Sequence, residues 1–380
     1  MTREQKTILT QVLLFLATFL TTTLAGAELC FGKSILSGNF SWNDFLLGMN
    51  YSVPFLFILS VHEFGHYFTA RYHHVRSSLP YYIPFYLPII FPFSIGTFGA
   101  LIRLREHVPS LKKNFDIGIA GPLAGMVAAL VVLIYGFISL PDPDYIFSIH
   151  PEYLKFGSKF ADHVYKPDFL KGGFDIVLGD NLLFNFLSRV IADPLKMPNP
   201  HEIIHYPFLL AGYLSLVFTA LNLMPIGQLD GGHVIYGLFG SKGHRIIAMT
   251  IFILFVFFAG LGTIHPGIPT DELMFSLPLY VGFLFFTLKG LKFHWQNTLI
   301  ITLIIFIAQY LTVYLIPSTV GFGSWLLFAF LLGRFMGIYH PPAIIEEPLS
   351  VGRKILGWLA MVILVLCFTP VPIEINAYLP

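Results

Sequence analysis

Two histidines and a glutamate lie close together in an apolar stretch of this sequence, at His62, Glu63 and His66. On a helix, residues four apart share one face, so the two imidazole rings point the same way. That spacing lets one nitrogen of each ring reach a single zinc ion at ~2.0–2.1 Å. The carboxylate of Glu63 follows the first ring, where it can take a proton from a metal-bound water. The pattern predicts a hydrolytic zinc site.

The composition indicates which solvent surrounds these residues. Hydrophobic residues make up 56% of the 380 positions and charged residues only 11%. A soluble domain carries roughly 25% charged residues, so this chain is predicted to be an integral membrane protein in contact with the lipid bilayer. Ionisable residues inside a membrane helix are costly, which favours a functional role for them over a polar cluster that only joins neighbouring helices. The net charge of +1 argues against a nucleic-acid partner.

The apolar runs predict an all-α polytopic membrane protein with about eight or nine transmembrane helices. The candidate spans are 7–27, 48–70, 115–139, 207–224, 246–263, 275–290, 298–316, 323–339 and 355–371. The apolar stretch 80–99 holds four prolines, which suit a small re-entrant or β-hairpin element better than a regular helix. Small residues in the third span, among them Gly121 and Gly125, indicate close helix packing.

Basic residues give the expected orientation, because cytoplasmic loops retain lysine and arginine. Under the predicted spans they gather on one side: Arg3, Lys6, Arg71, Arg76, Arg103, Arg105, Lys112, Lys113, Lys242, Arg245, Lys289, Lys292, Arg353 and Lys354. The other side holds segment 140–206, which has mixed polarity and no recognisable domain. We therefore expect a cytoplasmic N-terminus and interpret 7–27 as a span rather than a signal peptide.

A catalytic zinc site uses three protein ligands and a water, so a third ligand must come from elsewhere in the chain. Asp230 is the strongest candidate, because a proline and three glycines around it are expected to break the helix and expose its carboxylate. The spans 48–70 and 207–224 run in the same direction. Both are therefore expected to deliver their polar residues to the cytoplasmic side.

Two further residues near Asp230 have alternative interpretations. His233 is a ligand, a partner of a ligand, or an interface histidine, and the last is the simplest. Asn222 either donates to a substrate oxyanion or bonds the backbone at the helix break. The only two cysteines, Cys30 and Cys367, exclude a cysteine-based zinc site and a disulfide framework.

These motifs resemble the site-two protease family of intramembrane zinc metalloproteases, in the branch shared by cyanobacteria, chloroplasts and other bacteria. Residues 62–66 are similar to the family's first metal motif, and residues 222–231 to its Asn-x-x-Pro…Asp-Gly motif. The runs 96–100, 115–125 and 227–233 are also similar to that branch. The resemblance covers roughly residues 48–240, whereas no PDZ or CBS domain is evident.

The resemblance implies a set of roles. Glu63 would be the catalytic base, and His62, His66 and Asp230 the zinc ligands. The substrates would be transmembrane proteins, in a bacterial inner membrane. A substrate strand would bind near four residues, which are Gly96, Thr97, Phe98 and Gly99.

The expected division of the chain has three parts. Residues 1–47 form the first transmembrane helix and an extracytoplasmic loop, 48–240 the protease core with segment 140–206, and 241–380 additional transmembrane helices. There are two alternative functions, a membrane metal-ion transporter and an inactive protease-like scaffold. The glutamate after the first histidine and the lack of an internal repeat argue against the transporter. Oligomerisation is left open.

Overall fold

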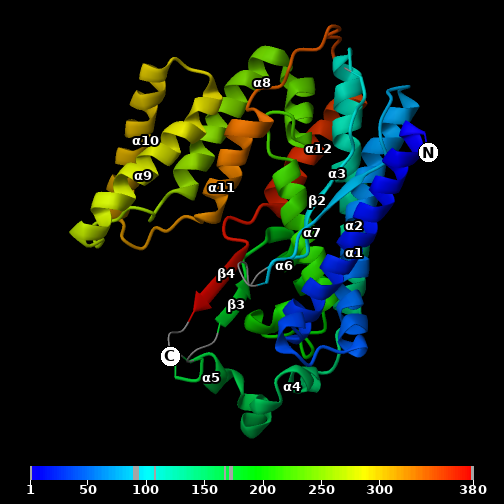
Figure 1. Cartoon of the computed structure of the whole chain (residues 1–380), viewed down its shortest axis with the longest axis vertical. Helices are drawn as coiled ribbons and strands as arrows, with labels where there is room; N and C mark the ends of the chain where they lie inside the picture. The colour runs from blue at the N-terminus through cyan, green and yellow to red at the C-terminus, as the bar shows by residue number, and fades with distance from the viewer. Residues whose placement is uncertain (1, 89–93, 107, 167, 171–173, 378–380) are drawn as a thin grey trace. The chain divides into compact units, whose positions relative to one another are not determined.

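The computed structural model describes residues 2–88, 94–106, 108–166, 168–170 and 174–377 (Figure 1). Over these residues the chain is mainly helical and has two small antiparallel sheets. It divides into two compact units. The first contains Met1–His107, Ala120–Leu221 and Val362–Pro380, and the second contains Val108–Ile119 and Asn222–Met361.

The first unit contains long apolar helices. They are α1 (Arg3–Phe31), α2 (Trp42–Tyr72), most of α3 (Leu111–Ile138) and nearly all of α7 (Pro207–Asn222). Both α1 and α2 begin with a capping box, in which the cap side chain and the third helical residue bond each other's backbone N–H. The two helices lie side by side (Figure 1). The hydroxyls of Thr22 and Ser52 meet between them at 2.8 Å, so each buried hydroxyl is satisfied.

The proline-rich stretch forms the predicted hairpin. Strand β1 (Tyr81–Pro84) pairs antiparallel with β2 (Thr97–Leu101). Residues 89–93 of the predicted segment lie outside the described residues. Two hydroxyls attach the hairpin to the helices: Thr21 of α1 donates to the Gly96 carbonyl at 2.7 Å, and Ser60 of α2 lies 2.7 Å from the Tyr82 hydroxyl.

Segment 140–206 folds into short elements around an aromatic core. They are 3₁₀ turns at Pro143–Tyr145, Pro151–Lys159 and Pro200–His205, helices α4 (Ile146–Ile149), α5 (Ala161–Val164) and α6 (Leu182–Ile191), and strand β3 (Phe174–Leu178). The core centres on Ile146, Tyr153 and Val164. Strand β3 pairs with β4 (Ile373–Ala377) near the C-terminus (Figure 1). This second sheet was not predicted, because its strands are far apart in the sequence.

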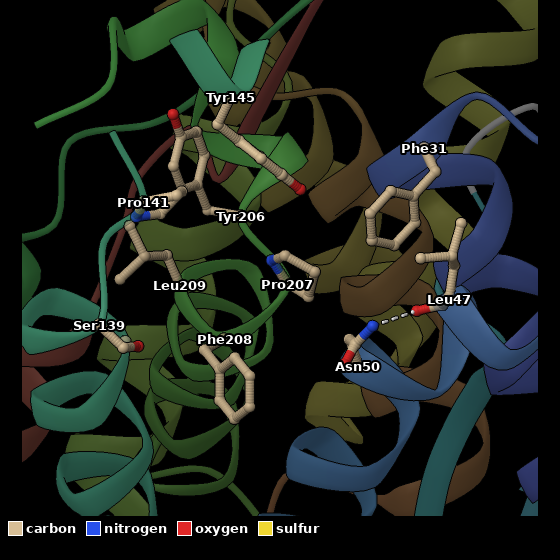
Figure 2. A pocket seen from close by; sticks show the side chains of 11 residues that line it. Phe31, Leu47, Asn50, Ser139, Pro141, Tyr145, Tyr206, Pro207, Phe208 and Leu209 are labelled. Carbon is tan, nitrogen blue, oxygen red and sulfur yellow. Dashed lines mark hydrogen bonds between the residues drawn. The ribbon is translucent and has the colours of Figure 1, made fainter. Parts of the chain in front are cut away.

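A pocket of about 310 Å³ lies where the ends of α1, α2, α3 and α7 meet (Figure 2). Its wall is mostly apolar and includes Phe31, Leu47 and Phe208. Asn50 is polar, but its side-chain amide donates to the Leu47 carbonyl at 3.0 Å. The described lining residues include no acid and no histidine. The pocket therefore offers apolar contact rather than acid–base or metal chemistry.

The second unit is a helical assembly. It contains α8 (Asp230–Ala259), α9 (Thr270–Leu288), α10 (Trp295–Leu315), α11 (Ser324–Leu331), a 3₁₀ turn at Lys289–Leu291, a π-helical turn at Leu332–Met336 and the start of α12 (Val351–Cys367). Gln309 of α10 is buried and donates to the carbonyls of Val256 and Phe257 in α8. It accepts from the Tyr280 hydroxyl of α9 at 2.8 Å. One satisfied amide thus joins three apolar helices.

Every predicted span coincides with a helix, but the helices differ in length. Six of them, α1, α2, α3, α8, α9 and α10, are long and apolar enough to cross a membrane. The remaining three predicted spans correspond to α7, α11 and α12, of which α7 has 16 residues and is mostly buried. The polytopic helical architecture is confirmed. The finer count of eight or nine spans stays a prediction.

Candidate metal centre

His62 and His66 lie on one face of α2, and both side chains are buried. Their Nε2 atoms are 3.1 Å apart. A tetrahedral zinc site with ligands at ~2.0–2.1 Å has edges of ~3.3 Å, so this separation suits two ligands of one ion. The predicted convergence of the two rings is therefore present in the first unit.

Glu63 is placed beside the histidine pair by the next position of the same helix. Its side chain is buried, with 4% of the residue exposed, and its Oε1 lies 4.0 Å from His62 Nε2. That distance is too long for a direct hydrogen bond but short enough for the carboxylate to reach a water held at the histidines. The three side chains can together hold a divalent cation and remove a proton from water.

Helix α3 provides the space that the imidazole rings occupy. A Cβ atom added at Gly121 would lie 2.1 Å from His66 Nε2, and one at Gly125 would lie 3.0 Å from the His62 Cβ. Real Cβ atoms do not approach so closely, so only glycine fits at position 121 without moving the ring. The close packing predicted from these small residues is present, and it is packing against the histidine pair.

Asp230 belongs to the second unit, where it is the first residue of α8. The turn before it is tight: a Cβ atom at Gly231 would lie 1.8 Å from the Leu223 carbonyl oxygen. The expected helix break is thus present between α7 and α8. A carboxylate at a helix N-terminus is stabilised by the free N–H groups and the helix dipole.

Asn222 and His233, the other two candidates near this turn, lie on either side of the helix break. Asn222 is the last residue of α7. The Nδ1 of His233 lies 2.8 Å from Nε2 of His340, and the His340 ring stacks on Tyr236. His340 was not expected here, because it is distant in sequence and matches no motif. The His233–His340 contact joins two segments of the second unit that are far apart in the sequence.

The four hairpin candidates divide into those that shape the hairpin and one that is exposed. The Thr97 hydroxyl donates to the Ile83 carbonyl at 2.8 Å and accepts from the Gly99 N–H at 3.0 Å. The Gly96 carbonyl is bonded to α1, as described above. Phe98 is 64% exposed and packs one face against Phe85. Phe98 is therefore the hairpin side chain best placed to contact another molecule.

His62, Glu63 and His66 of α2 lie in a stretch that matches a known protein family. The family model described as peptidase family M50 matches residues 50–261, which is more than half of the chain. The chain belongs to peptidase family M50. The resemblance to site-two proteases seen in the motifs is confirmed. With six helices among its described residues that are long and apolar enough to span, this M50 chain is a multi-pass membrane protein.

Curated relatives of this M50 chain carry zinc in their names. "Probable zinc metalloprotease EGY1, chloroplastic" of Oryza sativa subsp. japonica is 32% identical over 180 residues, covering 47% of this chain and 26% of that protein. The Arabidopsis thaliana protein of the same name is 28% identical over 211 residues, covering 56% of this chain and 33% of that protein. The chain thus matches about a third of these relatives' length or less. No solved structure matches.

Zinc is the metal that the family and these relatives imply. Two buried imidazoles whose Nε2 atoms are 3.1 Å apart supply nitrogen donors at the separation zinc requires. The donor set of the first unit fits the ion.

Replacing Gly121 with alanine tests the packing of α3 on the site. The added methyl group displaces His66, so we expect Gly121→Ala to lower zinc affinity by roughly 10–100-fold, as for other changes that misorient a ligand. Zinc competition with a chromophoric chelator measures the change. Gly282→Ala in α9, where a Cβ atom meets nothing within 4 Å, is the control. Unchanged affinity in Gly121→Ala would contradict the packing account.

Proposed function

We propose that this chain is an intramembrane zinc protease that hydrolyses peptide bonds of transmembrane protein substrates. The observation that carries the proposal is the buried pair of imidazole nitrogens 3.1 Å apart with the Glu63 carboxylate beside it. This group lies inside the stretch that matches peptidase family M50. Ion transport needs ligands but no general base, so the presence of Glu63 favours hydrolysis.

Asp230 is proposed as the third zinc ligand with His62 and His66. Two imidazoles and one carboxylate form a donor set used by catalytic zinc sites. Asp230 lies within the family match and begins a helix directly after a break. We further propose residues 48–240 as the protease core, since the family match covers residues 50–261. The charge distribution described above supports a cytoplasmic N-terminus, and a bacterial inner membrane is our proposed location.

The mechanism follows from what each side chain can do. The ion, when bound, supplies Lewis acidity to the attacking water and the scissile carbonyl. Glu63 accepts a proton from that water on its carboxylate and donates the proton to the leaving amine. Asn222 donates a hydrogen bond to the oxygen that becomes negative. Burial of Glu63 and both histidines limits competing water around these charges.

The substrate is proposed to bind as an extended strand on β2. The sheet that the described strands form here has only β1 and β2, so the other edge of β2 offers backbone N–H and C=O groups. Phe98 projects from this strand and is largely exposed. Strand addition would also unwind a substrate helix locally, which peptide hydrolysis requires.

Glu63→Gln tests the assignment of the base. We expect a loss of roughly 10²–10⁴-fold in kcat with zinc retained, because the amide keeps the shape of the side chain but cannot accept the proton. Cleavage of a single-span membrane protein with a glycine-interrupted helix is followed in proteoliposomes. Glu272→Gln, at an exposed position in the first turn of α9, is the matched control. A Glu63→Gln variant that cleaves at the wild-type rate would refute the base and the function.

Phe98→Ala tests substrate binding on β2. Loss of the exposed ring is expected to reduce kcat/KM by roughly tenfold through a higher KM, with little change in zinc content. Leu87→Ala removes another exposed apolar side chain of the region and should have little effect. Equal kinetics for Phe98→Ala and wild type would argue against substrate contact at this residue.

A further inference from the structure

A second group of metal-binding side chains lies in the segment between α3 and α7. His150, Glu202 and His205 each offer one atom, and these atoms all lie within 4.8 Å of one another. All three residues belong to the first unit. The two His Nε2 atoms are 3.1 Å apart, and Glu202 Oε2 lies 3.5 Å from His205 Nε2 and 4.0 Å from His150 Nε2.

The hydrogen bonds of the two rings fix where their protons lie. His150 Nδ1 is 2.9 Å from a carboxylate oxygen of Glu152, and His205 Nδ1 is 2.8 Å from the Cys30 carbonyl oxygen. Carboxylate and carbonyl oxygens only accept, so both Nδ1 atoms carry the proton. In the neutral rings both Nε2 lone pairs then face each other. Such a contact needs a cation between them, either a proton or a metal ion.

The carboxylate of Glu202 favours a metal ion over a proton. One of its oxygens accepts from the Tyr165 hydroxyl at 2.7 Å, while the other is directed at the two histidines. A proton is shared by two atoms, whereas here three donor atoms converge.

The three separations match those of a coordination site. Edges of 3.1, 3.5 and 4.0 Å bracket the ~3.3 Å edge of a tetrahedral zinc site, so the donors need to move only a few tenths of an ångström. The Nδ1 partners, a carboxylate and a backbone carbonyl, are those that commonly orient zinc-binding histidines. Tyr145 lines the apolar pocket (Figure 2). Its hydroxyl also donates to the His205 backbone carbonyl at 3.0 Å.

We propose that His150, Glu202 and His205 bind a second zinc ion, outside the long apolar helices. Three protein ligands leave one position of the ion for water. Since His205 also bonds Cys30 at the end of α1, the ion fixes segment 140–206 to that helix. This site does not depend on the function proposed for the α2 histidines.

Zinc counting in the full-length protein tests the second site. The double variant His62→Ala/His66→Ala, which lacks the α2 pair, is expected to retain about one zinc ion per chain after dialysis against metal-free buffer. Adding Glu202→Gln, which keeps the bond from Tyr165 but removes the charge, is expected to eliminate this ion. Mass spectrometry of the metal and the Tm with and without added zinc are the measurements. Added zinc should raise the Tm of the double variant but not that of the triple variant.

The controls separate a lost ligand from a misfolded segment. His163→Gln in the same segment, whose ring stacks on Phe156, should keep the ion. Glu152→Gln, at an exposed position, leaves the ligands in place but removes the charge that orients His150, so zinc should bind roughly 10–100-fold more weakly. A double variant without zinc and without a zinc-dependent Tm would overturn the proposal. Retention of the ion after Glu202→Gln would overturn it as well.

Discussion

Two imidazole nitrogens brought to 3.1 Å inside an apolar helix impose the constraint on which the first unit depends. Polar side chains in an apolar helix that spans a membrane are unfavourable unless protein covers them and a partner satisfies them. Helix α3 provides the cover, and its glycines let it approach α2 closely without displacing the two rings. The base role proposed for Glu63 relies on the same enclosure, because a buried carboxylate next to His62 has few competing waters.

The hairpin of β1 and β2 also has polar backbone groups that need hydrogen-bond partners. Its backbone is bonded to protein, because Thr21 donates to the Gly96 carbonyl and Thr97 donates to the Ile83 carbonyl. These bonds leave Phe98 and the edge of β2 accessible. The proposal that a substrate adds to β2 as an extended strand rests on this accessible edge.

Local patterns predicted most of the elements, and distant contacts account for what was missed. The His62–His66 spacing, the prolines of the hairpin and the apolar runs are all short-range signals, and each has its expected element. Pairing of β3 with β4, the contact of His233 with His340, and the cluster of His150 with Glu202 and His205 join residues far apart in sequence. The spacing of residues within a short stretch of sequence cannot predict such long-range contacts. His205 has Glu202 three residues before it, but His150 is 55 residues away, so no local spacing predicts the three together.

Zinc content of the Asp230→Ala variant tests the central claim most directly, since it asks whether the α8 carboxylate completes the site of the α2 histidines. The measurement is made in a chain that also carries Glu202→Gln, so that only this site contributes. The account predicts about one zinc ion per chain with Asp230 present and a loss of most of it in Asp230→Ala. Gln228→Ala, at an exposed position of the same turn, should retain the ion. Undiminished zinc in Asp230→Ala would contradict the account.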